Sequence, residues 1–465
     1  MKFDSDIVIG LEVHVQLDTK TKLFCGCPTK GSDEPNSRTC PTCLGMPGSR
    51  PVFNKKALEY GLKFAIATGS AISKQLVFSR KSYFYPDLAK NYQITQYELP
   101  LAKDGFITVN GRKIMLTRAH LEEDPAALVH PKGVGKSAYV LVDYNRSGNP
   151  LLEIVTEPML RSPEEAREFL RELMKILSYL EIFDLKDGII KADANVSIQR
   201  TGYARIEIKN ITGFKEIEAA LKYEVDRQRT EKVVTETRLW DSERRVTERL
   251  REKEAEIDYG YIVDSDLPMV EITDQMVEKI SKEMPELAAA KMERFVKEHG
   301  LAKEDALVLT AEKTLAELYE KVAKHVERKL AAKWLRRELM RVVHYNKKEL
   351  HEVIVDEGNL IALLGLVQEG KITEQVGQKL IEMLIERPFD VKAYVKKEGL
   401  AAVSDTKKLE KYCKEAIKEN SKAVEDYKKG NEKALHFIVG AVMKKTKGKA
   451  TPKEVNEILK RMVGR

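Results

Sequence analysis

Four of the five cysteines lie close together, as Cys25-Gly26-Cys27 and, after twelve intervening residues, Cys40-Pro41-Thr42-Cys43. Close pairs on two turns let four thiolates converge on one ion, which is typical of a tetrahedral zinc site. Four sulfur ligands leave no position for a substrate, so we expect a structural zinc ion. Reduced thiols or disulfides are the alternative. Cys413 lies on the apolar stripe of a predicted helix, where we expect a small buried side chain.

A second candidate site lies in residues 7–17, where aliphatic side chains alternate with other residues. A period of two predicts a strand whose aliphatic face packs on a core, while Glu12, His14 and Gln16 project from the other face. A polar strand face that is merely solvated is the alternative interpretation.

Four further segments carry carboxylates or amides in strand-like or turn contexts, at 120–124, 151–155, 192–197 and 205–210. If these strands share a sheet, one face gathers a set of polar side chains: Glu12, His14, Glu153, Asp193, Asn195, Glu207 and Lys209. Oxygen-rich ligation indicates Mg²⁺ or Mn²⁺, which usually bridge nucleotide phosphates to a few carboxylates. The histidine is less typical of Mg²⁺ and leaves the metal open.

The secondary structure that positions these residues is expected to change along the chain, from strands and loops to helices. Twelve of the 16 prolines precede Glu164, which indicates loops and strands, whereas from about residue 286 apolar residues recur at helical spacing. Ser162-Pro163-Glu164-Glu165 and Thr451-Pro452-Lys453-Glu454 each combine a capping residue, a first-turn proline and a following glutamate. Both strings therefore predict the start of a helix.

Length and composition exclude several classes of protein. The 465 residues predict two or three domains, at about 100–200 residues each. Apolar residues make up 43% and charged residues 33%, which excludes disordered and fibrous chains. No segment approaches the roughly 18 apolar residues of a membrane span, and the first residues lack the apolar core of a signal peptide. We expect a soluble, cytoplasmic protein without membrane association.

The positive charge is concentrated near the C-terminus. Residues 399–465 contain 17 Lys and Arg against 9 Asp and Glu, although the whole chain carries only +7. Such a local excess indicates contact with a polyanion, with a solvated helical surface as the alternative. Four of these lysines lie between two predicted helices: Lys444, Lys445, Lys447 and Lys449.

The familiar nucleotide-binding loops are missing from the sequence. Gly133-Val134-Gly135-Lys136-Ser137 ends like a Walker loop, but His130 occupies the position of its first glycine, and no GxGxxG string opens a helix. ATP would therefore bind without such a loop. The chain also lacks a serine-rich amidase stretch, so a reaction that consumes ammonia would need another chain to produce it.

Several strings resemble the GatB family, the B subunits of tRNA-dependent amidotransferases. They are residues 9–17 (IGLEVHVQL), the cysteine cluster at 25–43, and residues 44–48, 80–87, 92–96, 143–148, 193–197 and 207–210. The resemblance continues through the helical region and covers essentially the whole chain. The GatE family is similar in its catalytic part but carries a large inserted domain, for which this chain has no room.

The resemblance implies an ATP-dependent ligase. ATP phosphorylates the side-chain carboxylate of Asp-tRNA(Asn) or Glu-tRNA(Gln), and ammonia then displaces phosphate to give Asn-tRNA(Asn) or Gln-tRNA(Gln). It also implies a heterotrimer with the glutaminase GatA and the small protein GatC. We expect an α+β fold with a mixed-sheet cradle domain over 1–285, including a zinc knuckle at 25–43. A helical domain over 286–398 and a basic helical tail over 399–465, similar to YqeY, follow.

The family's functional positions can be transferred to this sequence. The resemblance places the Mg²⁺ or Mn²⁺ ligands at Glu12, His14, Glu123 and Glu153, with Lys81 as a further catalytic residue. It places nucleotide or acyl-end contacts at Lys81, Asn195, Glu207 and Lys209. The structural zinc falls on Cys25, Cys27, Cys40 and Cys43, and the lysine cluster at 444–449 becomes a tRNA contact.

Two strings depart from the family pattern and remove positive charge. Glu122-Glu123-Asp124 continues as Pro125-Ala126-Ala127 instead of Ala-Gly-Lys, and residues 258–263 read DYGYIV instead of DYRYFP. Any phosphate contact that the family makes at these positions is in doubt here. Two alternatives for the function stay open: a non-catalytic, zinc-containing tRNA-binding scaffold, and a GatE-like enzyme restricted to Glu-tRNA(Gln).

The basic tail leads to the first prediction. Removal of residues 399–465 should weaken tRNA binding and flatten its dependence on salt, by about one unit of slope in log K for each phosphate that the protein no longer neutralises. Filter binding over a series of salt concentrations measures this slope. An unchanged slope would contradict a tRNA-binding role of the tail.

Overall fold

The computed structural model of the protein describes residues 3–132, 137–252, 260–348, 350–402, 406–446 and 448–464. Residues 133–136 of the Walker-like string, residues 258–259 and Lys447 therefore lie outside the described part. The chain divides into two compact units, Met1–Leu287 and Ala288–Arg465.

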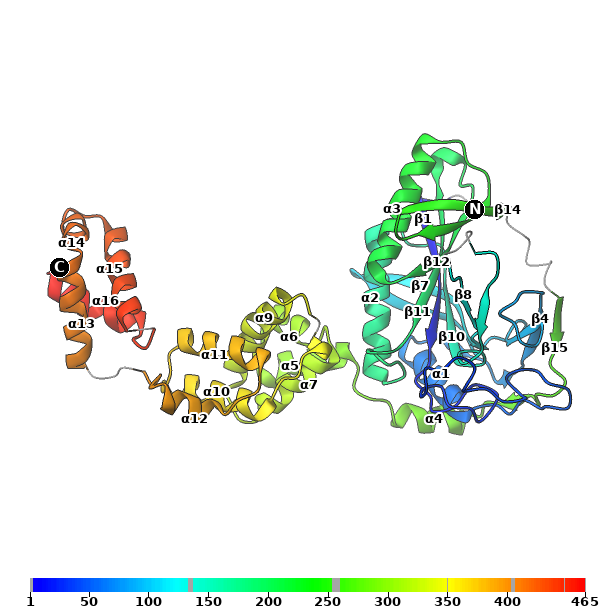
Figure 1. Ribbon diagram of the computed structural model, residues 1–465, viewed down its shortest axis with the longest axis horizontal. Coiled ribbons are helices and arrows are strands. Elements are labelled where there is room, and N and C mark those ends of the chain that lie inside the picture. The colour runs from blue at the N-terminus through cyan, green and yellow to red at the C-terminus, as the bar shows by residue number, and fades with distance from the viewer. Residues whose placement is uncertain are drawn as a thin grey trace. The chain divides into compact units, whose positions relative to one another are not determined.

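A nine-stranded mixed sheet forms the centre of the first unit (Figure 1). Its strand order is β14-β13-β12-β11-β1-β10-β7-β6-β2. Neighbours are antiparallel except β12 and β13, which are parallel. The strands are β1 (Ile7–Gln16), β2 (Ala71–Ile72), β6 (Ala102–Val109), β7 (Arg112–Glu123), β10 (Pro150–Thr156), β11 (Ile190–Ile198), β12 (Ile206–Thr212), β13 (Glu236–Asp241) and β14 (Val246–Glu252).

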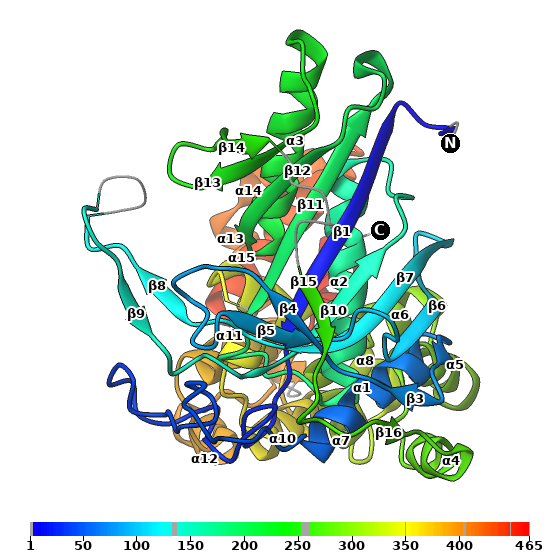
Figure 2. The ribbon, with the colours of Figure 1, turned by 90° about the vertical axis from the view of Figure 1, so that its right-hand side faces the viewer.

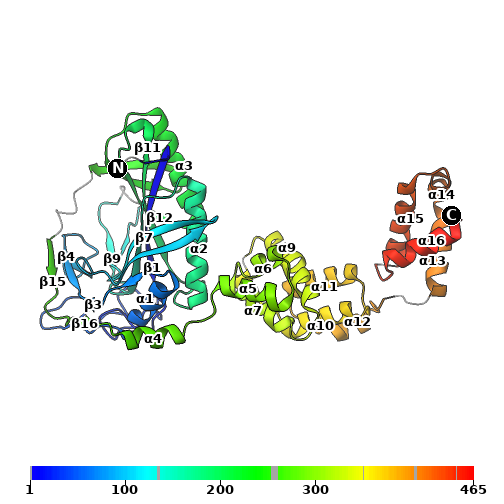
Figure 3. The same cartoon turned by 180° about the vertical axis from the view of Figure 1, so that it is seen from behind.

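Helices cover one face of this sheet, as Figures 1 and 3 show from opposite sides. Their apolar residues form a single core with the aliphatic side chains of β1, where Ile9, Leu11, Val13 and Val15 are at most 1% exposed. The predicted strand, with its aliphatic side chains on one face, is therefore confirmed for β1. The helices are α1 (Lys55–Ala67), α2 (Pro163–Leu180) and α3 (Phe214–Thr230), with α4 (Asp274–Lys282) against α1.

The predicted start of α2 is confirmed in detail. The Ser162 hydroxyl accepts a hydrogen bond from the Glu165 backbone N–H at 3.1 Å, and Pro163 occupies the first turn. Such a cap satisfies a backbone donor that the helix itself cannot pair. The helix is therefore anchored at a defined position beneath the sheet.

Shorter strands lie over the face that the helices leave free. A three-stranded sheet in the order β15-β4-β5 stands in front of the large sheet in Figure 2. Just after β5, the Gln96 side-chain oxygen accepts a hydrogen bond from the Leu121 backbone of β7 at 2.8 Å, which ties the two sheets together. These strands are β4 (Ser79–Ser82), β5 (Tyr92–Thr95) and β15 (Gly260–Val263), and the pairs β3 (Gln75–Leu76) with β16 (Val270–Glu271) and β8 (Ala127–Val129) with β9 (Leu141–Asp143) complete the unit.

The described part of the second unit is helical, as predicted. Residues of its last four helices, among them Leu409, Cys413, Ile438 and Leu459, form a separate apolar core. Cys413 is fully buried there. The boundary at 398/399 stays a prediction. The helices are α5 (Ala288–His299), α6 (Lys303–Leu309), α7 (Lys313–Val322), α8 (Arg328–Lys333), a π-helical turn (Trp334–Leu339), α9 (Met340–Tyr345), α10 (Glu357–Gln368), α11 (Glu374–Glu386), α12 (Val391–Lys397), α13 (Thr406–Glu419), α14 (Ser421–Lys428), α15 (Glu432–Lys445) and α16 (Pro452–Val463).

Within the described residues, none of the helices combines the length and the apolar character needed to span a membrane.

Candidate functional site

The polar face of β1 lies at the middle of the large sheet. Because β1 pairs with both β10 and β11, His14 stands opposite Glu153 on one side and Lys191 on the other. Glu12 stands opposite Asp193 of β11. On the far side of β10, Glu153 is paired with His120 of β7. Strand pairing thus aligns polar side chains from four neighbouring strands on the face opposite the helices.

Three carboxylates converge on the imidazole of His14. Its Nε2 atom lies 3.7 Å from Glu12 Oε1, 3.4 Å from Glu122 Oε1 and 3.5 Å from Glu153 Oε2. The side chains of Glu122 and Glu153 are 4% and 6% exposed, whereas those of His14 and Glu12 are 22% and 31% exposed. The cluster therefore has a buried inner side and an open outer side.

The crowding of these carboxylates changes their protonation. The neighbouring Glu153 and burial raise the pKa of Glu12 to about 7. Burial disfavours the charged form of His14, but its hydrogen bond to Glu153 and the fields of Glu122 and Glu12 outweigh burial and raise its pKa to about 10. Both shifts show that the cluster favours additional positive charge. A divalent cation fits this donor set of carboxylate oxygens and one imidazole.

The structure places Glu123 apart from this cluster and puts Glu122 in the expected position. Glu123 accepts a hydrogen bond from the Ile94 backbone at 2.8 Å and one from Lys90 Nζ at 2.7 Å. Successive residues of a strand point to opposite faces, so Glu122 and Glu123 cannot both face His14. Leu121 is buried in the core, so its neighbours His120 and Glu122 point to the other face.

Lys81 reaches the cluster from the overlying sheet. It lies on β4, between Gln93 of β5 and Tyr261 of β15. Burial alone would lower its pKa, but the fields of Glu122, Tyr261 and Glu153 outweigh burial and raise it. Lys81 therefore keeps its positive charge beside two carboxylates of the cluster.

A second polar group lies on β11 and β12, beside Glu12. The Lys209 ammonium is 3.1 Å from Asp193 Oδ2 and 3.3 Å from Glu207 Oε1. The Asn195 side-chain oxygen accepts a hydrogen bond from Arg205 Nε at 2.8 Å. Three of the predicted nucleotide or acyl-end residues, Asn195, Glu207 and Lys209, therefore share the sheet face with Glu12 and His14.

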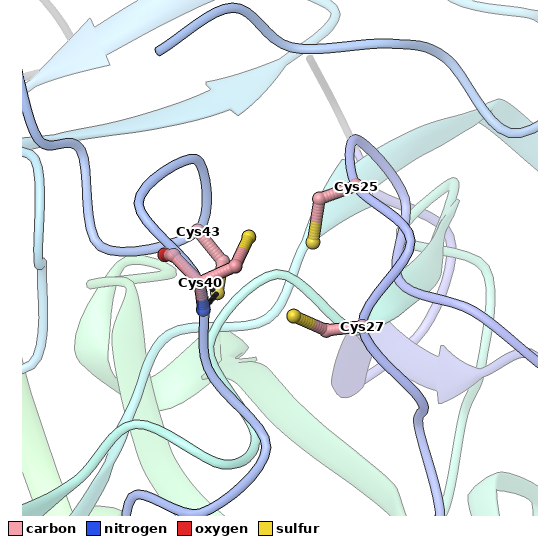
Figure 4. A group of neighbouring side chains, drawn as sticks. All are labelled: Cys25, Cys27, Cys40 and Cys43. Atoms are coloured by element: carbon pink, nitrogen blue, oxygen red, sulfur yellow. Dashed lines mark hydrogen bonds between the residues drawn. The ribbon is translucent and has the colours of Figure 1, made fainter.

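The four clustered cysteines form a compact group, with their sulfur atoms turned toward one another in Figure 4. All four thiols are free, and their Sγ atoms lie within 4.8 Å of one another. The hydrogen bond from the Cys25 thiol, the Cys40 backbone N–H and the Lys22 ammonium lower the pKa of Cys43 to about 4. Four converging sulfurs, one of them readily ionised, fit a tetrahedral metal ion.

Lys22 is fully buried beside this cluster. Its Nζ atom donates to Cys43 Sγ at 3.7 Å and to the Tyr144 carbonyl at 3.3 Å. Four thiolates around a divalent ion carry a net negative charge, and a buried ammonium offsets part of it. Sequence reasoning did not single out Lys22, because its burial depends on the loop that carries Tyr144.

A cavity of about 160 Å³ separates the cysteine cluster from Glu123. Lys22, Cys25, Cys43, Lys90 and Glu123 are among the residues that line it. The Glu123 side chain thus lies beside the cysteine cluster, whereas the Glu122 side chain faces His14.

The lysines expected to bind RNA lie around the end of α15. Lys444 is exposed, whereas Lys445 is half-buried and pairs with Glu419 at 2.7 Å. Lys449 is half-buried. Among the described residues of this group, Lys444 is therefore exposed to solvent, whereas Lys445 and Lys449 are partly buried.

Comparison with known proteins covers most of the chain. The family model described as the GatB/GatE catalytic domain matches residues 7–278, and the one described as the GatB domain matches residues 317–463. The proteins named as the B subunit of aspartyl/glutamyl-tRNA(Asn/Gln) amidotransferase are 43% identical in Carboxydothermus hydrogenoformans, 44% in Thermodesulfovibrio yellowstonii and 41% in Thermotoga maritima. In each case 98% of both chains is covered.

The cysteine cluster leads to the second prediction. Cys40→Ser should lower the zinc content below one equivalent and reduce stability on the order of several kcal/mol, because the binding energy of a structural ion is also folding energy. Elemental analysis and thermal unfolding measure the two effects. Cys413→Ser is the matched control and should keep its zinc. Full zinc in Cys40→Ser would argue against a four-thiolate site.

The different orientations of Glu122 and Glu123 lead to the third prediction. Glu122→Gln should weaken Mn²⁺ binding at least about tenfold, because it removes a charged ligand. Glu123→Gln should leave Mn²⁺ binding within about twofold, since this side chain does not face His14. Electron paramagnetic resonance of free Mn²⁺ gives both affinities. The reverse ranking would restore Glu123 as the ligand.

Proposed function

The chain belongs to the GatB family, and on this premise we propose that it is the component of a tRNA-dependent amidotransferase that activates and amidates the amino acid on tRNA. The substrate is Asp-tRNA(Asn), Glu-tRNA(Gln) or both. The enzyme is an ATP-dependent, carbon–nitrogen bond-forming ligase. One observation supports this proposal above the others: Glu12, Glu122 and Glu153 converge on His14 at an accessible face, beside the cationic Lys81.

The first step we propose is phosphorylation of the substrate. A side-chain carboxylate oxygen attacks the γ-phosphorus of ATP, the bond to the ADP oxygen breaks, and an acyl phosphate forms. Glu12, His14, Glu122 and Glu153 would hold Mg²⁺ or Mn²⁺, which supplies charge neutralisation for the phosphates. Lys81 adds a fixed ammonium that stabilises the charge on the transferred phosphoryl group. Asn195, Glu207 and Lys209 contact the nucleotide or the acyl end.

The second step is amidation. Ammonia attacks the acyl carbon, loses a proton and expels phosphate, which is a far better leaving group than the oxide of a free carboxylate. The sequence shows no amidase motif, so a separate glutaminase, GatA, supplies the ammonia, and GatC completes the heterotrimer. The four cysteines hold a structural zinc ion, and the lysines of the tail contact tRNA phosphates.

Two observations weigh against the alternatives. The relatives named as B subunits align with 98% of this chain and over 98% of their own length. This favours a protein of the GatB type over one of the GatE type. A solvated scaffold face would not bury Glu122 and Glu153 beside each other, since burial of like charges costs free energy unless a cation compensates them.

The fourth prediction tests this function directly. Glu12→Gln should lower the rate of amidation at least about 100-fold, because it removes charge stabilisation in the transition state, while tRNA binding stays within about twofold. The assay follows amide formation by the heterotrimer with ATP, Mg²⁺ and an ammonium salt, which bypasses glutamine hydrolysis.

The control and the substrates decide between the alternatives. Glu271→Gln, which changes an exposed glutamate on β16, should keep full activity. Assays with Asp-tRNA(Asn) and with Glu-tRNA(Gln) identify the substrate, and turnover of Glu-tRNA(Gln) alone would favour the GatE-like activity. Wild-type protein that binds tRNA but forms no amide would support the scaffold.

A further inference from the structure

We propose that His120 is a positioning residue: its Nε2–H orients the carboxylates of Glu122 and Glu153 toward the cation without binding the cation itself. This inference rests on the proposed function, because it assumes a divalent cation at the His14 cluster. It concerns a residue to which the sequence assigned no role.

The geometry places His120 on the buried side of the cluster. Its side chain is 3% exposed, and its Nε2 atom lies 3.3 Å from Glu153 Oε2 and 3.6 Å from Glu122 Oε2. Ionised carboxylates only accept hydrogen bonds. The ring nitrogen that faces both of them therefore carries a hydrogen.

The other ring nitrogen distinguishes a donor from a metal ligand. His120 Nδ1 is buried and has no hydrogen-bond partner among the described residues. A histidine that binds metal through Nε2 carries its hydrogen on Nδ1 and almost always donates it to a carboxylate, a carbonyl or water. Ligation by His120 Nε2 would leave this donor buried and unpaired, which is unfavourable. In a neutral ring with its hydrogen on Nε2, Nδ1 is an acceptor instead, and the N–H faces Glu153 Oε2 at an Nε2–O distance of 3.3 Å.

His14 differs from His120 on the same criteria. Its side chain is 22% exposed, and neither of its ring nitrogens is a buried atom without a partner. It also reaches Glu12, which lies on the open side of the cluster. The two histidines therefore flank the same carboxylates from opposite sides, His14 where a cation and substrate can enter, and His120 where they cannot.

Two more donors complete the support behind the carboxylates. The Thr95 hydroxyl donates to Glu122 Oε2 at 3.1 Å, and Arg118 Nη2 lies 3.5 Å from Glu153 Oε1. Glu122 Oε2 thus accepts from Thr95 and lies 3.6 Å from His120 Nε2, while Oε1 is directed at His14. Such outer contacts commonly determine both the orientation and the affinity of a metal site.

Mn²⁺ binding to the full-length chain, without ATP or tRNA, tests the proposal. His120→Leu keeps the volume but removes the donor, and it should weaken Mn²⁺ binding about 10–100-fold. His120→Gln keeps an N–H at a similar reach and should recover most of the loss. His130→Leu, at a histidine outside the cluster, is the matched control. Thermal unfolding and zinc content show whether each variant is folded.

Pulsed electron paramagnetic resonance separates positioning from ligation. The spectrum of bound Mn²⁺ should show one directly coordinated histidine nitrogen in the wild type, in His120→Leu and in His120→Gln, and none in His14→Gln. Loss of a coordinated nitrogen in either His120 variant would overturn the proposal and make His120 a ligand. Unchanged affinity in folded His120→Leu would also overturn it.

The outcome is independent of the outcome for the proposed function. A heterotrimer that forms amide while His120→Leu binds Mn²⁺ normally disproves only the positioning role. A chain whose Mn²⁺ affinity depends on His120 but whose heterotrimer forms no amide disproves only the proposed function. A wild-type chain that does not bind Mn²⁺ disproves the positioning role, and amide formation by the heterotrimer still decides the proposed function.

Discussion

The repulsion among Glu12, Glu122 and Glu153 is the constraint on which the functional face depends. Three carboxylates held around one imidazole are unfavourable unless positive charge compensates them. The fold supplies part of this charge through His14, Lys81 and Arg118, and it leaves the outer side open. The arrangement is stable enough to persist because each carboxylate is attached to a strand in the middle of a large sheet, whose back is covered by helices.

The two candidate metal centres lie on opposite sides of β7 and have opposite designs. The cysteine cluster has four sulfur donors and a buried lysine, which leaves no position for another ligand. The His14 cluster combines oxygen donors with one imidazole and remains partly exposed. This contrast matches the general difference between structural sites, which are closed, and catalytic sites, which keep positions open.

The cysteine loop is also connected mechanically to the strands of the functional face. The Leu23 backbone donates to the Gly148 carbonyl at 2.8 Å, and Gly148 donates to the Asp124 carbonyl at 2.8 Å. Gly148 precedes β10, which carries Glu153, and Asp124 follows β7, which carries Glu122. An ion that holds the cysteine loop in place therefore also stabilises the ends of two strands that supply carboxylates.

Short-range patterns in the sequence were sufficient to predict the strand β1, the helix starts, the cysteine cluster and the family, because alternation, capping residues and short motifs act over a few neighbouring residues. They also predicted that Glu12, His14 and Glu153 share one face, and the strand register agrees. The choice between Glu122 and Glu123 required the folded structure, because it depends on which side of β7 packs on the helices. Likewise, His120, Thr95 and Lys22 emerged only from the fold, since their partners come from strands and loops distant in the chain.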